Sequence, residues 1–252
     1  YSGIAFLLIL GGISFRAYRR KREDHKVILE KSIETEEQKS IIEQAHIEIQ
    51  DSINYARRIQ SAILPPEEEI YYPKDVVAGD FYWIEQKGDS TYIAVADCTG
   101  HGVPGAIVSV VCNNALNRSL REYNLSDAAA ILNKTREFII HEFKTAEATS
   151  VKDGMDIALC KITGNQIQFA GANNAVWHFT NGELELYKGD KQPVGEFYDP
   201  KPFTNKEFSF KANDLIYLFT DGIIDQFGGE KGKKLKSNNL KLFLQQNFDK
   251  SL

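Results

Sequence analysis

The sequence predicts an α+β domain with antiparallel sheets, preceded by a long helix. Beyond residue 66, short β-type runs follow one another with turns too short for the crossovers that parallel strands need. Two helical stretches lie among these runs, which is the pattern of a layered α+β domain. Residues 23–64 contain no proline or glycine and are rich in helix formers, so they predict one continuous helix.

Composition sets broad limits on function. The chain has 252 residues, of which 42% are hydrophobic and 26% charged, enough for one sizeable globular domain and an appendage. A net charge of −5 argues against nucleic-acid binding, which would need a basic stripe. The three cysteines show no metal-ligand spacing and indicate a reduced compartment. The only methionine is Met155, so we expect the natural start to lie upstream of Tyr1.

Residues 1–22 predict the end of a transmembrane helix. Residues 1–15 are uncharged and mostly apolar, and five basic residues follow between Arg16 and Arg22. A full span needs about 20 apolar residues, so we expect part of it to lie upstream. A signal peptide would carry its basic residues before the apolar run, whereas in this chain they follow it. A buried helix is the alternative. A membrane helix would tether the protein to the inner (cytoplasmic) membrane, with the rest of the chain in the cytoplasm.

The second segment, residues 23–64, carries a heptad in its C-terminal half. One seam position recurs every seven residues, at Ile42, Ile49, Ala56 and Ile63, and the second at Ala45, Ser52 and Ile59. This pattern predicts a parallel coiled coil and therefore a homodimer. The alternative is a single amphipathic helix packed on the domain. Pro65-Pro66 ends the helix in either case.

The third segment, residues 65–252, supplies the elements of the α+β domain. Helices are predicted at 105–123 and 126–144, the second with Ser126 as its N-cap. Asn181-Gly182 predicts a hairpin turn. The apolar run 215–219 has the character of a central strand buried on both faces. The predicted strands cover residues 156–162, 166–172, 176–180, 184–188, 203–210 and 214–220.

A hairpin between residues 76 and 98 brings two carboxylates together. Gly88-Asp89 suits a two-residue turn, and the resulting register sets bulky residues against small ones, as in the pair of Phe81 with Ala96. The same register sets Asp80 opposite Asp97, with Cβ atoms about 4.5–5.5 Å apart. Facing like charges are destabilising, and no neighbouring strand position holds a basic residue, so a bound cation explains the pair. A bulge that separates the two, or two solvated turn residues, are the alternatives.

A third carboxylate, Asp221, ends the apolar run, and Asp225 would share a helical face with it. Asp221 could cap a helix or bind a metal, and this segment alone leaves both open. Carboxylates with backbone oxygens and water suit Mg²⁺ or Mn²⁺. A pair of such ions can activate water for attack on a phosphoryl group. The residues therefore predict metal-dependent phosphoester hydrolysis without a protein nucleophile.

Six motifs occur together in a characteristic order: VVAGDFYW, VADCTGHGVPGA, DGMDIALCKI, AGANNAVW, KQPVG and YLFTDGIIDQFGGEKGKK. With them, the chain from about Ser52 to its end resembles the SpoIIE-type branch of the metal-dependent (PPM, type 2C-like) serine/threonine protein phosphatases. The stretch SINYARRIQSAILPP also resembles the helix that precedes the catalytic domain in membrane-tethered members.

The resemblance implies an αββα sandwich, in which two antiparallel sheets are flanked by helices. It also implies a centre of two Mn²⁺ or Mg²⁺ ions with a bridging water. The residues that match the family's metal site are Asp80, Asp97, Asp221, Cys98 through its backbone carbonyl only, and Asp225 in a weaker accessory role. The family normally closes with a strand that bears an Asp-Asp pair. We expect this strand to lie beyond Leu252, so that residues 65–252 form a phosphatase domain truncated at its C-terminus.

For four further polar residues, the sequence allows a functional role or a purely structural one. His101 could act as a general acid toward the leaving seryl oxygen or lie in an ordinary turn between glycines. Asp156 could line a substrate groove or be a hydrogen-bonded residue at a strand edge. Asn173 and Asn174 have the character of turn residues rather than ligands.

The sequence therefore predicts a membrane-tethered phosphatase that hydrolyses phosphoserine or phosphothreonine on a regulatory protein. By family resemblance, the substrate class includes anti-sigma-factor antagonists. One competing hypothesis is a catalytically inactive module that binds a phosphoprotein and dimerises through its coiled coil. The other is a carboxylate-metal phosphodiesterase.

Overall fold

The computed structural model describes residues 2–64, 77–144, 153–228 and 232–247. The chain divides into two compact units, Tyr1–Ser52 and Ile53–Leu252. The first unit is part of helix α1 (Ser2–Ile63), which ends just before Pro65-Pro66, as predicted. No helix within the described residues combines the length and the apolar character that crossing a membrane requires.

The predicted heptad seam lies on the surface of α1. Ile42 is 69% exposed and Ile49 is 59% exposed in the single chain. Exposed isoleucines at seam positions are compatible with a partner helix, and the coiled coil itself stays a prediction.

The second unit begins at Ile53 and so includes the last turns of α1, upstream of the predicted domain start at residue 65. The physical reason is Gln60, whose side chain is buried in this unit. Its Nε2 donates to the carbonyl oxygen of Ala78 at 2.6 Å and to Oγ of Ser109 at 3.0 Å. A buried amide needs such partners, so these bonds fix the end of α1 on the domain.

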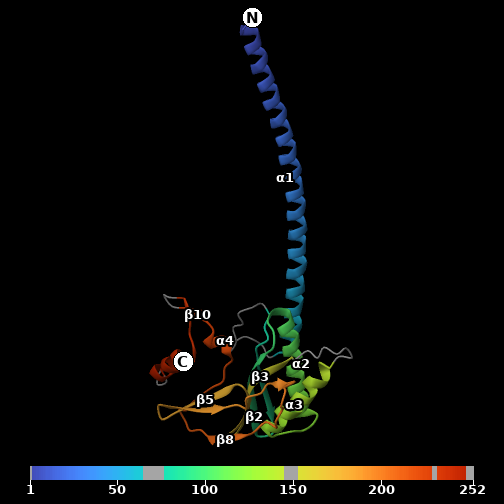
Figure 1. Cartoon of the computed structure of the whole chain (residues 1–252). Coiled ribbons are helices and arrows are strands. Elements are labelled where there is room, and N and C mark those ends of the chain that lie inside the picture. Colours follow the sequence, from blue (N-terminus) through green and yellow to red (C-terminus); the bar gives the residue numbers. More distant parts are fainter. Residues whose placement is uncertain (1, 65–76, 145–152, 229–231, 248–252) are drawn as a thin grey trace. The chain divides into compact units, whose positions relative to one another are not determined.

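Two antiparallel sheets form the centre of the second unit (Figure 1). The first has the strand order β1-β2-β3-β4-β8, with β7 paired to β3, and the second has the order β6-β5-β9. The strands of the first sheet are β1 (Phe81–Lys87), β2 (Ser90–Cys98), β3 (Gly154–Thr163), β4 (Gln166–Ala172), β7 (Val194–Gly195) and β8 (Lys206–Ser209). Those of the second are β5 (Ala175–Thr180), β6 (Glu183–Lys188) and β9 (Leu215–Tyr217).

Helices lie on both sides of the paired sheets. The helices of this unit are α2 (Gly102–Arg121), α3 (Ala128–Glu142), α4 (Asp221–Ile224) and α5 (Ser237–Asn247), and a small hairpin is made by β10 (Phe227–Gly228) and β11 (Lys233–Lys234). Figure 1 shows α2 and α3 on one side of the sheets and the red C-terminal helix on the other.

Among the residues that the structure describes, three hydrophobic cores lie between the four layers. The largest joins α2 and α3 to the first sheet, through residues such as Leu116, Leu132 and Ile157. The second fills the space between the sheets, and the third packs Trp177 and Phe179 of β5 against Leu240 of α5. The predicted αββα sandwich is therefore the observed architecture.

The β1–β2 hairpin has the predicted register. Phe81 pairs with Ala96, and Gly88 takes the positive φ that its turn requires. Asn181 and Gly182 likewise form the predicted turn between β5 and β6, both with positive φ. A two-residue turn of this kind matches the twist of its flanking strands.

Several element boundaries differ from the prediction. Helix α2 begins at Gly102 rather than 105, and the N-cap of α3 is Asp127, which accepts from the N–H of Ala130, rather than Ser126. Strand β8 is shorter than 203–210 because Asn133 holds the N–H of Phe203. The short elements β7 and β10–β11 were not predicted, since two-residue strands leave no periodicity to detect.

The interpretation of residues 215–219 as a central strand buried on both faces was wrong for the described structure. Strand β9 covers only Leu215–Tyr217, and it lies at the edge of the described part of the second sheet with its side chains half-buried. The run is apolar because each of its two faces packs against a hydrophobic core. Leu215 contributes to the core on one side and Ile216 to the core on the other.

Candidate metal centre

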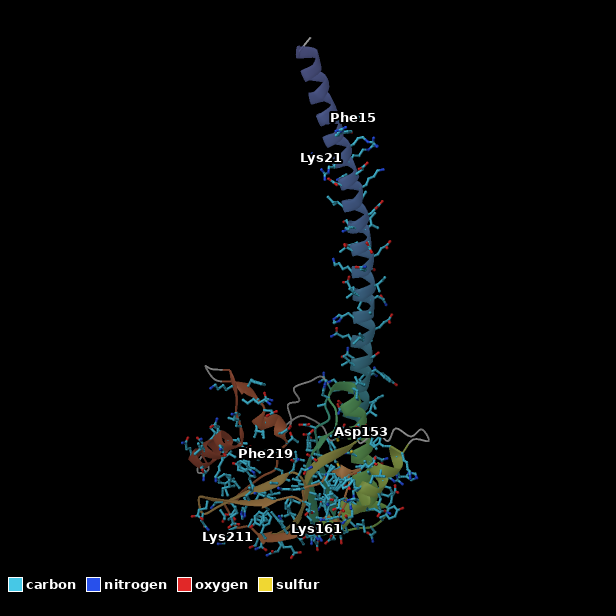
Figure 2. All side chains as sticks on the ribbon, viewed as in Figure 1. Phe15, Lys21, Asp153, Lys161, Lys211 and Phe219 are labelled. Atoms are coloured by element: carbon cyan, nitrogen blue, oxygen red, sulfur yellow. The ribbon has the colours of Figure 1, made fainter. Side chains whose placement is uncertain are left out.

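The strand register directs a row of carboxylates toward the gap between the two sheets. In β2, Ala96 and Cys98 face the helices, so Asp97 between them faces the second sheet. In β3, Asp156 is the register partner of Asp97, on the same face. Asp80 directly precedes β1, next to the Phe81–Ala96 pair. Asp153, labelled in Figure 2, lies just before β3, at the end of the strand where these carboxylates lie. Lys161 lies near the opposite end of β3.

Asp97 has a strongly perturbed electrostatic environment. Burial, then a hydrogen bond and repulsion from Asp80, then the charges of Asp221 and Asp156, raise its pKa to about 8. Every charged group that shifts this pKa is therefore another carboxyl. An arrangement in which carboxyls disfavour each other's ionisation is what a bound cation would relieve.

Asp80 is tied to the second sheet by the segment that follows β9. Thr220 Oγ1 donates to Asp80 Oδ2 at 2.6 Å. Thr220 is also the N-cap of α4, but its hydroxyl makes no capping bond. Asp221 is the first residue of α4 and is exposed, so the capping position that was an alternative for Asp221 belongs to Thr220.

Glycines let two loops meet beside these carboxylates. A Cβ atom on Gly79 would lie 2.9 Å from the carbonyl oxygen of Cys98, and a Cβ on Gly105 would lie 2.5 Å from that of Gly100. At contacts this short, any side chain at either position would force the neighbouring backbone to shift. The Cys98 carbonyl therefore lies next to the segment that carries Asp80, while the Cys98 thiol is buried and its pKa is raised by that burial.

Asp156 is held by a residue that the sequence assigned only to a turn. Asn173 Nδ2 donates to Asp156 Oδ1 at 2.8 Å. Asn173 is also a turn residue as predicted, with a φ of 55°. Burial is the main cause that raises the pKa of Asp156; the Asn173 bond lowers it and the charge of Asp221 raises it. The interpretation of Asp156 as a hydrogen-bonded strand residue is thus confirmed, and its position beside Asp97 gives it a place in the cluster.

Two predicted candidates are not among the groups that shift the pKa of Asp97. Asp225 is paired with Lys234 of β11, Oδ2 to Nζ at 2.6 Å, so its accessory role stays a prediction. His101 is exposed at the N-cap position of α2, and its side chain makes no capping bond.

Sequence reasoning missed the roles of three residues, Thr220, Asn173 and Gln60. All three stand inside the stretches that carry the family resemblance, so those stretches were the signal that could have found them. None of the three carries a charge that would have drawn attention to its side chain.

The chemistry of the donor set fits a divalent cation. Asp80, Asp97 and Asp221 could supply hard oxygen ligands, and the backbone at Cys98 could supply a carbonyl, which is the set that Mg²⁺ or Mn²⁺ prefers. Within the described ranges, no three acidic, histidine or cysteine side chains already have ligand geometry. The fit therefore rests on the mutual repulsion of the carboxyls around Asp97, which a cation would relieve.

Comparisons with known proteins agree with this architecture. Residues 87–251 match the family model for stage II sporulation protein E (SpoIIE). The solved SiaA-PP2C domain of Pseudomonas aeruginosa is 32% identical, with a TM-score of 0.69, and the match covers 81% of this chain and 84% of that domain.

Two further relatives are more distant. The phosphoserine phosphatase RsbU of Bacillus subtilis (strain 168) is 26% identical over 192 residues, which are 71% of this chain and 55% of RsbU, so the chain spans about half the length of this curated relative. The PP2C phosphatase domain of SpoIIE from Bacillus subtilis, solved with a fragment of its regulatory domain, shares the fold at a TM-score of 0.53 and 16% identity. That match covers 70% of this chain and 48% of the solved one.

Proposed function

This chain belongs to the SpoIIE family, and we propose on that premise that it is a metal-dependent phosphatase acting on phosphoserine or phosphothreonine of a regulatory protein. The observation that carries the proposal is the carboxyl cluster around Asp97, where burial and the charges of Asp80 and Asp221 raise its pKa at one end of the gap between the sheets. Such a strongly perturbed group beside like charges is typical of a functional site.

The residues of the proposed site either bind metal or orient the residues that do. Asp80, Asp97 and Asp221, with the Cys98 carbonyl, would hold Mn²⁺ or Mg²⁺. When bound, such ions supply Lewis acidity and lower the pKa of water at the phosphoryl group. Thr220 orients Asp80 through its 2.6 Å bond. The pairing of β2 with its neighbours holds Asp97 in a fixed direction.

The substrate proposal is supported by the name of one relative. RsbU is a phosphoserine phosphatase, and it shares 26% identity with this chain over 192 residues. The substrate that we propose is a phosphorylated regulatory protein such as an anti-sigma-factor antagonist.

Two features of α1 support the proposed assembly and location. The exposed heptad isoleucines support homodimerisation, and the apolar residues before Arg16 support a membrane tether with the catalytic unit in the cytoplasm. Flotation of the full-length protein with lipid vesicles, against the protein lacking residues 1–22, tests the tether.

The test of the activity is hydrolysis of a phosphoserine peptide by the full-length protein with Mn²⁺. We expect turnover that EDTA removes, and we expect Asp97→Asn to abolish it because the substitution removes a ligand charge. Asp89→Asn is the matched control, since Asp89 is exposed in the turn at the other end of the same hairpin. Full activity in EDTA, or in the Asp97→Asn variant, would rule out the metal-dependent mechanism.

Two other outcomes select the competing functions. Binding of a phosphoprotein without turnover under any metal condition would select the non-catalytic module. Activity on phosphodiesters but not on the phosphoserine peptide would select the phosphodiesterase.

A further inference from the structure

A fourth aspartate faces the proposed metal ligands. Asp156 is the register partner of Asp97 in the β2–β3 ladder. Directly opposite residues have Cβ atoms about 4.5–5.5 Å apart, and like charges at this spacing are destabilising. The fold therefore places a second acidic side chain directly beside Asp97.

The orientation of Asp156 is fixed by the next strand. Asn173 follows β4, one step beyond the Ile157–Ala172 pair, and its Nδ2 donates to Asp156 Oδ1 at 2.8 Å. The backbone of Asn173 is itself held, because its N–H donates to the carbonyl oxygen of Asp190 at 2.8 Å. Its φ of 55° suits asparagine better than most residues. An amide donor leaves the carboxylate charged, so the bond directs the negative charge without neutralising it.

We propose that Asp156 supports the metal centre: its charge strengthens cation binding, and Asn173 sets its orientation. The inference rests on the proposed function. It adds a residue outside the set of Asp80, Asp97, Asp221 and the Cys98 carbonyl. Groups that support metal ligands in this way typically contribute about 10–100-fold to metal affinity.

The test measures Mn²⁺ binding and metal-free stability on the same variants of the full-length protein. Asp156→Asn keeps the shape of the side chain and can still accept from Asn173, but it removes the charge. We expect Mn²⁺ to bind about 10–100-fold more weakly, by electron paramagnetic resonance of free Mn²⁺. We expect the metal-free Tm at pH 8 to rise by about 1–3 °C, because a like-charge pair has been removed.

Two further variants complete the design. Asn173→Gly tolerates the positive φ and removes only the amide, so we expect a smaller loss of Mn²⁺ affinity than for Asp156→Asn. Asp127→Asn is the matched control, because Asp127 is half-buried and accepts from the N–H of Ala130 at the N-terminus of α3, away from the cluster. We expect it to leave Mn²⁺ affinity unchanged, and to change Tm little because asparagine also caps helices well.

The outcomes separate this inference from the proposed function. If the wild-type protein binds Mn²⁺ and Asp156→Asn binds it equally well, the inference is overturned and the proposed function stands. A lowered metal-free Tm in Asp156→Asn would show a structural role and would also overturn it. If the wild-type protein binds no Mn²⁺, the proposed function itself fails.

Discussion

At the scale of single residues, Gly105 packs directly against the backbone of other segments. A Cβ atom there would lie 2.5 Å from the carbonyl oxygen of Gly100 and 3.3 Å from the Cα of Gly79. Neither contact involves a flexible side chain that could move aside. The segment before β1, which carries Gly79, and the loop after β2, which carries Gly100, therefore keep their spacing only while this position is glycine.

The prediction is that Gly105→Ala lowers the free energy of unfolding by about 1–3 kcal/mol, the usual cost of forcing extra atoms into a packed site. Urea denaturation followed by circular dichroism measures the change. Gly228→Ala is the control, because nothing lies within 4 Å of a Cβ there, and its effect should stay within about 0.5 kcal/mol. Equal losses in the two variants would contradict the steric explanation.

At the scale of elements, Gln60 joins the end of α1 to two other segments. Its amide bonds the backbone of Ala78 and the hydroxyl of Ser109 in α2, in a buried setting. Gln60→Leu would leave the Ala78 carbonyl without this donor, at a cost of about 1–3 kcal/mol. Thermal or urea unfolding of the full chain measures the loss. Gln50→Leu, at an exposed position of the same helix, should change stability little, and a loss as large as that of Gln60→Leu would contradict the prediction.

A buried contact between Asp214 and β5 gives the fold a dependence on pH. The backbone N–H of Lys211 and then His178, whose Nε2 lies 2.9 Å from Asp214 Oδ2, lower the pKa of Asp214 from its ordinary 3.8. A carboxyl with a lowered folded-state pKa stabilises the fold above its unfolded pKa. That stabilisation is lost as pH falls through the lowered value.

Asp214→Asn should therefore be less stable than the wild-type protein at pH 7, with a difference that shrinks as pH falls from about 5 to 2. Urea midpoints across this range measure it. Asp199→Asn is the control, because Asp199 is exposed and makes only a surface ion pair with Lys201. A difference between Asp214→Asn and the wild-type protein that stays constant with pH would argue against this role of Asp214.

At the scale of the whole molecule, the sequence was most informative where a pattern repeats or a turn has a strict residue requirement. Gly88 and Asn181-Gly182 predict their hairpins because those turns need positive φ, and the register then follows by counting. Counting residues outward from the turn of the β1–β2 hairpin also predicts, from the sequence alone, that Asp80 lies near Asp97.

The remaining features depend on contacts that no local pattern encodes. The N-cap of α3 is Asp127 rather than Ser126. Both residue types cap helices well, so the sequence alone does not distinguish them, and neighbouring contacts decide. Asn173 and Gln60 bond partners 17 and 18 residues away, and an uncharged amide gives no signal of that. The half-buried edge strand β9 could not be distinguished from a central strand, because an apolar run indicates that a strand is buried but not how many neighbouring strands it pairs with.

The exposed heptad of α1 leads to a prediction about assembly. Ile42 and Ile49 are seam positions, 69% and 59% exposed in the single chain, and burying such side chains contributes about 1.5–3 kcal/mol each. The full-length protein should therefore be a dimer by analytical ultracentrifugation. Ile42→Asp combined with Ile49→Asp should raise the dissociation constant at least about 100-fold.

The chain offers a matched control for this double variant. Ile33 and Ile47 are also exposed, at 54% and 50%, but both lie outside the seam on the far side of the heptad. Ile33→Asp combined with Ile47→Asp adds the same charge and removes the same hydrophobic side chains from the single chain, and it should leave the dimer intact. Equal dissociation of both double variants would mean that charge, rather than the seam, controls assembly. A wild-type protein that sediments as a monomer would leave α1 as a single helix, the alternative to the coiled coil.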